Sequence, residues 1–589
     1  MLRRQYRRVA RGLSEDPPDS GTDGVEQGKR LIRLGGDRGL SLADRVAERL
    51  QRLTWKTPIH TMRLRGRHPL KLIAVGDDPF LGDAERGNAL LEGVLTFRGE
   101  ERAVAALDFT KANFSKAFSE HLHSFAWLRD LSTVATRAQG APIAEAIMAK
   151  WLEAHAEKVS EPAWRADLWG RRILAWTAHA PLLLSGNDLV YKSTVLHALA
   201  RGARHLDRAA DRVQIGPPRI AAWCGVLVAG LVIPGGDPRR SFGEAGLKRA
   251  LDASLFSDGG TVGRSPVGQL DAIMLLTLLC ETYEARRLEA PAFVRTALAK
   301  MVTALLGVCH GDRGLSSWQG GVPVSGAVIT QAIEATGVRT RPLKQAREWG
   351  YQRLSAGGTV LIMDAAPPPL ARLVEGGCAS TLAFELSDGP HRIVVNCGGA
   401  RMAHAQMPAA LIDGLRTTAA HSTLIVGDSN STAIHADGTL GRGVGEVELS
   451  RHETDNSSRI EASHDGYARR FGFIHRRQIA LASDGRDLRG EDMLLPADRR
   501  RKKGTTPFAV RFHLAPDIEI APTADGMAAF LRTATGAVWQ FRARGGTLAI
   551  EDSVWIDARG KPIASEQLVV TAESPPGGAN VGWVFHRAN

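Results

Sequence analysis

The sequence has few cysteines, and none is arranged in a redox or metal-binding pair. Five cysteines occur among 589 residues, at positions 224, 280, 309, 378 and 397. The number is odd and no CxxC spacing is present, which argues against a disulfide framework. We therefore expect reduced, structural cysteines, a state that neither requires nor excludes an oxidising compartment.

Long hydrophobic runs are also missing. No run of about 18 apolar residues occurs, so no transmembrane segment is expected. The N-terminal stretch is rich in arginine but has no apolar core and no small-residue cleavage motif, so it does not resemble a secretory signal.

Recognisable nucleic-acid modules are absent as well, although the chain is basic. The net charge is +12 and the isoelectric point is near 9.7. Such a charge suits nucleic acid, an anionic membrane surface or an acidic polysaccharide. Because the basic residues are scattered and no zinc finger accompanies them, we expect no nucleic-acid partner.

The length indicates two or more domains, since 589 residues exceed one ordinary core. Residues 1–40 are charged and rich in glycine, which predicts a flexible basic arm. Its arginines form either a solvated tail or a lipid-binding patch. They are Arg3, Arg4, Arg7, Arg8 and Arg11.

Residues 41–340 have apolar positions at helical spacing, for example within 169–184 and 267–287. Helix follows helix, and no repeat of solenoid length is visible. We predict an incomplete α/α toroid with a cleft at one end. Trp127, Trp176, Trp223 and Trp318 fall either in its core or on a sugar-stacking surface.

Residues 350–589 change to short alternating runs separated by Asp-Gly turns, which predicts a large antiparallel β-sandwich. Within it, residues 381–386 and 391–396 are expected to form two strands joined by a turn at 387–390. A long polar loop then leads to His421, just before a third strand. Polar residues at strand ends are well placed for chemistry.

Ordered segments from both halves resemble the heparinase II/III-like polysaccharide lyases. LAFELSDGPHRIVVNCGG at 382–399 and RTTAAHSTLIV at 416–426 are two of them. The others lie at 122–131, 171–184, 257–266, 463–479, 488–496, 510–517 and 548–555. The resemblance implies β-elimination on an uronate-containing acidic polysaccharide, in a cleft between toroid and sandwich. It also implies a cell-envelope or periplasmic location, with the cytoplasm as the alternative because no signal is visible.

Such a reaction needs a base, a proton donor and groups that neutralise the substrate carboxylate. The resemblance implies His421, His464 and Tyr467 as catalytic candidates and Arg416, Arg264 and Asn396 as substrate contacts. Each also has a structural interpretation. For example, His464 and Tyr467 could act as a turn brace, a pair of side chains that stabilises the turn between them. His475, Arg476 and Arg477 are expected on a solvated strand face.

Some positions depart from the family pattern. Cys378 and Thr261 stand where relatives commonly have histidine, and no tyrosine follows Pro266. No cofactor is required, but the resemblance admits a zinc or other divalent metal held by Cys378, Asn396 and His421. The departures leave an alternative function open, a catalytically impaired glycan-binding or envelope-assembly protein on the same fold. The oligomeric state is not predicted.

Overall fold

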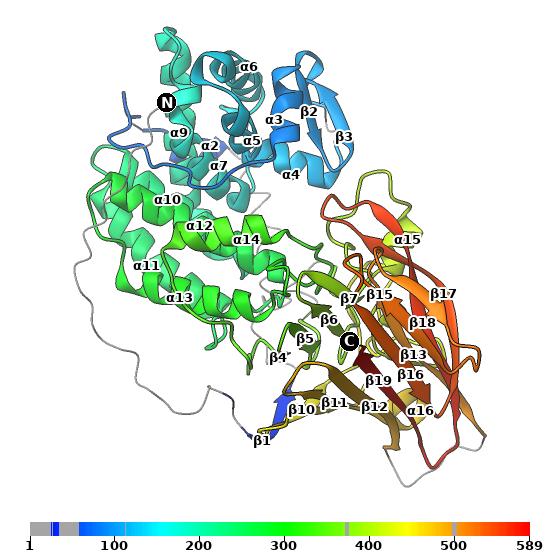
Figure 1. Cartoon of the computed structure of the whole chain (residues 1–589). Helices are drawn as coiled ribbons and strands as arrows, with labels where there is room; N and C mark the ends of the chain where they lie inside the picture. Colours follow the sequence, from blue (N-terminus) through cyan, green and yellow to red (C-terminus); the bar gives the residue numbers. More distant parts are fainter. Residues whose placement is uncertain are drawn as a thin grey trace.

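The computed structural model describes residues 25, 27–33, 58–66, 68–111, 113–370, 376–497 and 504–588. A helical half comes first and two large antiparallel sheets follow, one stacked on the other (Figure 1). This arrangement confirms the predicted fold class. The five arginines of the N-terminal arm lie outside the described residues.

The helical domain is built around one apolar helix. α10 (Pro217–Val232) is buried continuously from Ile220 to Val232 and packs against its neighbours α7, α11 and α12. At its crossing with α7, a Cβ on Gly170 would lie 2.1 Å from the carbonyl oxygen of Ala221, so only glycine permits this close approach. The other helices of the domain are α2 (Pro58–Arg63), α3 (Ala84–Leu91), α4 (Lys116–Ser124), α5 (Trp127–Val134), α6 (Arg137–His155), α7 (Ala166–Ala178), α8 (Ala180–Leu183), α9 (Leu189–Ala209), α11 (Asp237–Ser254), α12 (Pro266–Ala285), α13 (Ala292–Gly307) and α14 (Gly326–Thr336).

The four tryptophans singled out in the sequence belong to this domain's core. Trp127, Trp176, Trp223 and Trp318 are at most 1% exposed. The core interpretation is therefore correct, and none of these rings is available to stack on a sugar. A small hairpin, β2 (Val94–Phe97) and β3 (Glu100–Ala103), extends from the helical domain toward the sandwich (Figure 1).

The sandwich consists of a nine-stranded and an eight-stranded sheet. The first has the order β1-β9-β10-β11-β12-β19-β16-β15-β14, and the second the order β17-β18-β13-β7-β6-β5-β4, with β8 paired to β13. The strands are β1 (Gly28–Arg33), β4 (Tyr351–Ala356), β5 (Thr359–Asp364), β6 (Phe384–Asp388), β7 (His391–Val395), β8 (Leu424–Val426), β9 (Glu446–Glu453), β10 (Ser457–His464), β11 (Phe473–Ala482), β12 (Asp487–Pro496), β13 (Thr506–Leu514), β14 (Glu519–Pro522), β15 (Ala528–Arg532), β16 (Val538–Arg544), β17 (Thr547–Ile556), β18 (Pro562–Ser574) and β19 (Ala579–Arg587).

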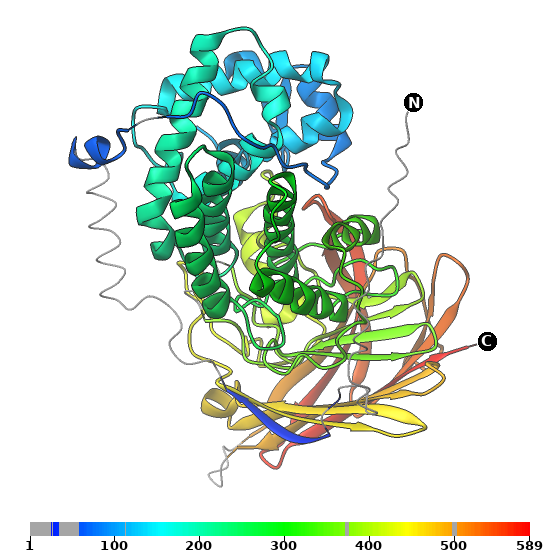
Figure 2. The ribbon, with the colours of Figure 1, turned by 90° about the vertical axis from the view of Figure 1, so that its left-hand side faces the viewer.

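Strand β1 differs from the expectation that residues 1–40 are a flexible arm. It pairs antiparallel with β9 at the edge of the nine-stranded sheet (Figure 2). Ile32 packs against the sandwich core. Six residues of β1 pair with the edge of β9 and hold the strand in place, and its charged sequence has no alternating apolar pattern that predicts a strand.

The hairpin predicted around residues 381–396 is present, with a tighter turn than expected. β6 and β7 pair as far as Asp388 opposite His391, so the loop contains only Gly389 and Pro390. Gly389 has a φ of +53°, which the common two-residue hairpin turns require at their first position. Among the described residues, no helix combines the length and apolar character needed to cross a bilayer.

Candidate functional site

Four segments meet where the helical domain joins the sandwich, and we call them the seam. They are residues 316–321 of the helical domain and residues 376–380, 396–401 and 416–422 of the sandwich. Backbone bonds hold the two domains together, from Arg401 N to Gly320 O (2.9 Å) and from Gly399 N to Gly321 O (2.8 Å). Because backbone groups make these contacts, the seam keeps one geometry.

Gln319 links the helical side of the seam to the sandwich. Its backbone has a φ of +52°, uncommon for a residue with a Cβ, and its side chain is fully buried. The amide oxygen accepts from the backbone N–H of Cys378 (3.1 Å), and the amide nitrogen donates to Ser380 Oγ (3.2 Å). Ser380 Oγ in turn donates to Asp364 Oδ2 (2.7 Å). No sequence pattern identified Gln319.

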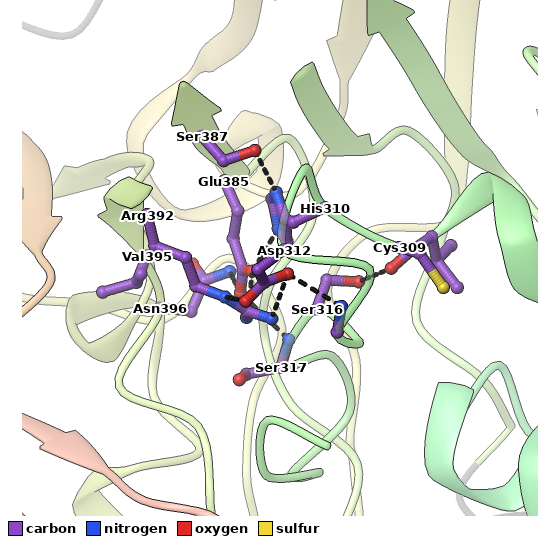
Figure 3. A network of polar contacts seen from close by, with 12 residues as sticks. Cys309, His310, Asp312, Ser316, Ser317, Glu385, Ser387, Arg392, Val395 and Asn396 are labelled. Atoms are coloured by element: carbon purple, nitrogen blue, oxygen red, sulfur yellow. Dashed lines mark hydrogen bonds and ion pairs between the residues drawn. The ribbon is translucent and has the colours of Figure 1, made fainter. Parts of the chain in front are cut away.

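A second interdomain network surrounds Glu385 (Figure 3). His310 Nε2–H donates to Glu385 Oε2 (2.9 Å), and its Nδ1 accepts from Ser387 Oγ (3.1 Å). Glu385 Oε1 accepts from Asn396 Nδ2 (2.9 Å) and from the backbone N–H of Ser317 (3.1 Å). Burial raises the pKa of Glu385, but the bond from His310 and nearby positive charge outweigh it and hold that pKa below its usual value.

His421 lies in the seam, in the tautomer that a general base requires. Its ring is 1% exposed, and Nδ1 lies 2.7 Å from the carbonyl oxygen of Thr417. A carbonyl only accepts, so Nδ1 carries the proton and Nε2 keeps the lone pair. Burial lowers the pKa of His421, although Thr417, Asp364 and Glu385 act in the opposite direction. The ring is therefore neutral near pH 7.

Two of the predicted substrate contacts, Asn396 and Arg416, use their polar atoms in hydrogen bonds within the protein. Both amide atoms of Asn396 are engaged, since Oδ1 also accepts from Ser422 N (2.9 Å). Arg416 Nη2 donates to the carbonyls of Gly377 (2.8 Å) and Gly438 (2.6 Å). These two side chains therefore hold the loops of the seam in place.

Arg264, the third predicted contact, is buried beneath the seam. It forms an ion pair with Asp364 and donates to the carbonyls of Trp349 (2.8 Å) and Pro367 (2.7 Å). Burial acts to lower the pKa of Arg264, but the charge of Asp364 outweighs it, so that the pKa is raised. This arginine joins the two domains and leaves no donor directed at a ligand.

The residues proposed for a metal do not fit one. The amide of Asn396 is held within the protein, since its oxygen accepts from Ser422 N and its nitrogen donates to Glu385. Burial raises the pKa of the Cys378 thiol to about 12, which keeps it protonated. Across the described ranges, no three His, Cys, Asp or Glu side chains form a cluster that could hold an ion. We derive no step through a metal.

His464 and Tyr467 lie together in the sandwich interior, behind the loop of His421. Their rings are 5.5 Å apart, as the intervening Asp-Gly turn suggested. His464 Nδ1 accepts from Gly466 N (3.1 Å), and the Tyr467 hydroxyl donates to the carbonyl of Leu424 (3.0 Å). Burial lowers the pKa of His464 and raises that of Tyr467. These contacts favour the turn-brace interpretation.

The expectation of a solvated strand face at residues 475–477 is wrong for two of the three. His475 and Arg477 are fully buried, whereas Arg476 is partly exposed. The period-two alternation of β11 directs residues 475 and 477 inward. There Asp492 on β12 accepts from both of them, from His475 Nε2 (2.7 Å) and Arg477 Nε (2.7 Å), and compensates the buried charge.

Two arginines missed by sequence reasoning lie beside the seam. Arg401 is exposed, and its stem covers Gly320 and Gly376, where a Cβ would lie 2.7 and 2.8 Å from Arg401 Cγ. Arg98, at the tip of the β2–β3 hairpin, donates to the carbonyl of Arg401 (3.1 Å). Burial and the charge of Arg401 lower the pKa of Arg98 to about 10, despite Glu120. Both remain cationic at neutral pH.

Buried neutral histidines predict a loss of stability in mild acid. Burial lowers the pKa of His121, His205 and His513 to about 3 and that of His155 to about 4, from a usual 6.5. Below pH 6.5 the unfolded chain binds protons that the folded chain does not, so each histidine costs about 1.4 kcal/mol per pH unit.

Calorimetric unfolding at pH 7 and pH 5 checks this. The melting temperature should be lower at pH 5. His155→Gln should make this difference smaller, because one of the histidines that cause it is removed. Equal melting temperatures at the two pH values would contradict the assignment of neutral buried rings.

The comparisons with known proteins agree with this architecture. Residues 338–584 match the family model of the heparinase II/III-like C-terminal domain. The crystal structure of heparinase III superposes with a TM-score of 0.67 at 12% identity, covering 95% of this chain and 93% of that chain. Heparan sulfate lyase HepC from Pedobacter heparinus gives a TM-score of 0.56 at 14% identity, covering 86% and 82%.

Residues 338–584 therefore resemble a heparinase II/III-like C-terminal domain. This confirms the predicted resemblance, and the whole chain has the fold of the solved lyases. The heparinase II/III-like domain supplies three segments of the seam, and the helical domain supplies residues 316–321. In sequence, the chain is 28% identical to the FtsZ-localized protein C of Caulobacter vibrioides (strain NA1000 / CB15N) over 586 residues, 94% of this chain and 97% of the relative.

Proposed function

We propose that the protein is a polysaccharide lyase that cleaves an uronate-containing chain by β-elimination at the seam. The observation that carries this proposal is the tautomer of His421, whose Nδ1–H is committed to Thr417 while Nε2 keeps its lone pair. A neutral imidazole held in this way is a suitable base for a carbon acid.

In the proposed reaction, His421 Nε2 removes the C5 proton of the uronate. The electrons of that C–H bond form the C4–C5 double bond, and the C4–O bond breaks with its electrons on the leaving oxygen. The resulting imidazolium returns the proton to that oxygen when both lie on the same face of the sugar. No oxidant, metal or second titratable group is needed to balance the step.

The arginines beside the seam explain why an acidic sugar is the proposed substrate. Arg401 is exposed and Arg98 donates to its carbonyl, so two cations near residues 396–401 would attract a uronate carboxylate to this part of the protein. Neutralising that carboxylate also makes the C5 proton more acidic. Asn396, Arg416 and Gln319 position the surrounding loops rather than bind the sugar.

A panel of acidic polysaccharides tests the proposal. Incubation with the purified full chain should produce the ultraviolet absorbance of unsaturated uronates with at least one of them, and Arg401→Glu should weaken the apparent affinity for that substrate. Absence of absorbance with every uronate polymer, under conditions where binding is measured, would overturn the lyase proposal.

The relative from Caulobacter vibrioides favours one second candidate, association with FtsZ. Its name places that protein with FtsZ, and the similarity extends over nearly the whole of both chains. If association is the function of this chain, the panel gives no absorbance and the chain co-sediments with FtsZ filaments. The compartment, envelope or cytoplasm, stays a prediction.

A further inference from the structure

A cavity of about 690 Å³ opens in the helical domain, away from the seam. It is lined by the segment that leads into α4, by α4 itself, by the C-terminal end of α6 and by the turn that precedes α7. None of its lining residues belongs to the four seam segments. Its volume is in the range of small-molecule sites, roughly 300–1,000 Å³.

One wall of the cavity is an aromatic corner of Phe109, His123 and His155. The ring centroids are 5.7 Å apart for Phe109 and His123 and 5.3 Å apart for the two histidines. Trp151 Nε1–H donates to His123 Nδ1 (3.2 Å), which leaves the proton of His123 on Nε2. His155 pairs through Nδ1 with Ser160 Oγ (3.1 Å).

His155 has one ring nitrogen without a hydrogen bond. Its Nε2 is buried and has no partner, although the backbone of Phe109 is close enough to favour the protonated ring. The residue is 6% exposed, and buried polar groups are rarely left in this state. His155 lines the cavity, so its neutral imidazole adds a polar group to a largely aromatic wall.

The charges around the cavity balance, which argues against a simple anion as the ligand. Arg165 is neutralised by Asp167 and Glu120, both at 2.6 Å. The exposed rim carries Glu153 as well as Lys158. Because burial lowers the pKa of His123 to about 2 and that of His155 to about 4, the corner adds no positive charge.

Rings with apolar faces and peripheral hydroxyls match these walls. Phe109 and Phe114 offer aromatic surface, while Ser119 and Ser160 offer hydroxyls. We propose that the cavity is a saccharide-binding site for one or two pyranose units, separate from the seam. The proposal does not depend on cleavage at the seam.

Two tetrasaccharides serve as ligands in the test, one of alternating glucuronate and N-acetylhexosamine and one of neutral N-acetylglucosamine. Hydrogen exchange of the full chain, followed by mass spectrometry, should show protection of peptides within residues 113–123 and 153–165 with at least one of them. Phe114→Ala and His155→Gln should each weaken binding about tenfold, or about 1.4 kcal/mol.

Two controls keep the proposal falsifiable. His421→Asn, in the seam, should change this affinity by less than about twofold, a difference of about 0.4 kcal/mol, and both cavity variants should keep the wild-type melting temperature within a few degrees. If Phe114→Ala alone is unstable, His155→Gln decides. Binding that protects only the seam peptides, no protection with either tetrasaccharide, or unchanged affinity in a folded cavity variant would overturn the proposal.

Discussion

Asp492→Ala should destabilise the sandwich by about 3–5 kcal/mol, since it removes the acidic partner of the buried Arg477. Asp492 accepts from Arg477 Nε (2.7 Å) and Nη2 (3.0 Å), from His475 Nε2 (2.7 Å) and from Trp583 Nε1 (2.9 Å). Asp492, His475 and Arg477 are all fully buried. Without the carboxylate, a guanidinium in the core loses its counter-charge.

Glu491→Ala is the matched control, because the neighbouring residue on β12 points to the opposite, partly exposed face. It should change the free energy of unfolding by no more than about 0.5 kcal/mol. Urea unfolding of both variants, followed by tryptophan fluorescence, compares the two positions. Equal losses would show that the buried network does not hold the sandwich together.

His421→Asn should reduce lyase activity by about 10²–10⁴-fold, the usual contribution of a general base. Asparagine keeps an N–H at the position that donates to Thr417 but has no titratable nitrogen in place of Nε2. The variant therefore separates proton transfer from the structural bond. The turnover rate measures the loss, and the melting temperature should change by only a few degrees.

His421→Ala is a less specific variant, because the buried position makes it affect stability as well as proton transfer. Alanine would remove the bond to Thr417 and leave a cavity around a residue that is 1% exposed. We therefore expect His421→Ala to lose stability as well as activity. His452→Asn, on an exposed position of β9, is the control and should retain full activity.

The fold was largely predictable because its two halves have different periodicities. Apolar spacing of the helical kind ends with α14, and alternation typical of strands begins with β4. Strand β1 was missed because its apolar residues, Leu31 and Ile32, are adjacent and give no alternating pattern. The inward charges of β11 were misplaced because polar residues occupy both faces of that strand, and only the position of Asp492 shows which face is buried.

The residues of the candidate site that lie next to strand ends could be predicted from the sequence. The residues that make contacts between the two domains could not. His421, Asn396 and Cys378 follow strands or precede them, and the structure brings their loops together. Gln319 and Glu385 were missed because they contact residues dozens of positions away in the other domain. No local pattern predicts such pairs.

The most direct test compares wild-type protein and His421→Asn on the polysaccharide that responds in the panel, with the products identified by mass spectrometry. Wild type should give fragments that end in an unsaturated uronate with no added water, and His421→Asn should give almost none while remaining folded. Fragments that contain added water, or equal rates for the two proteins, would contradict β-elimination by His421 at the seam.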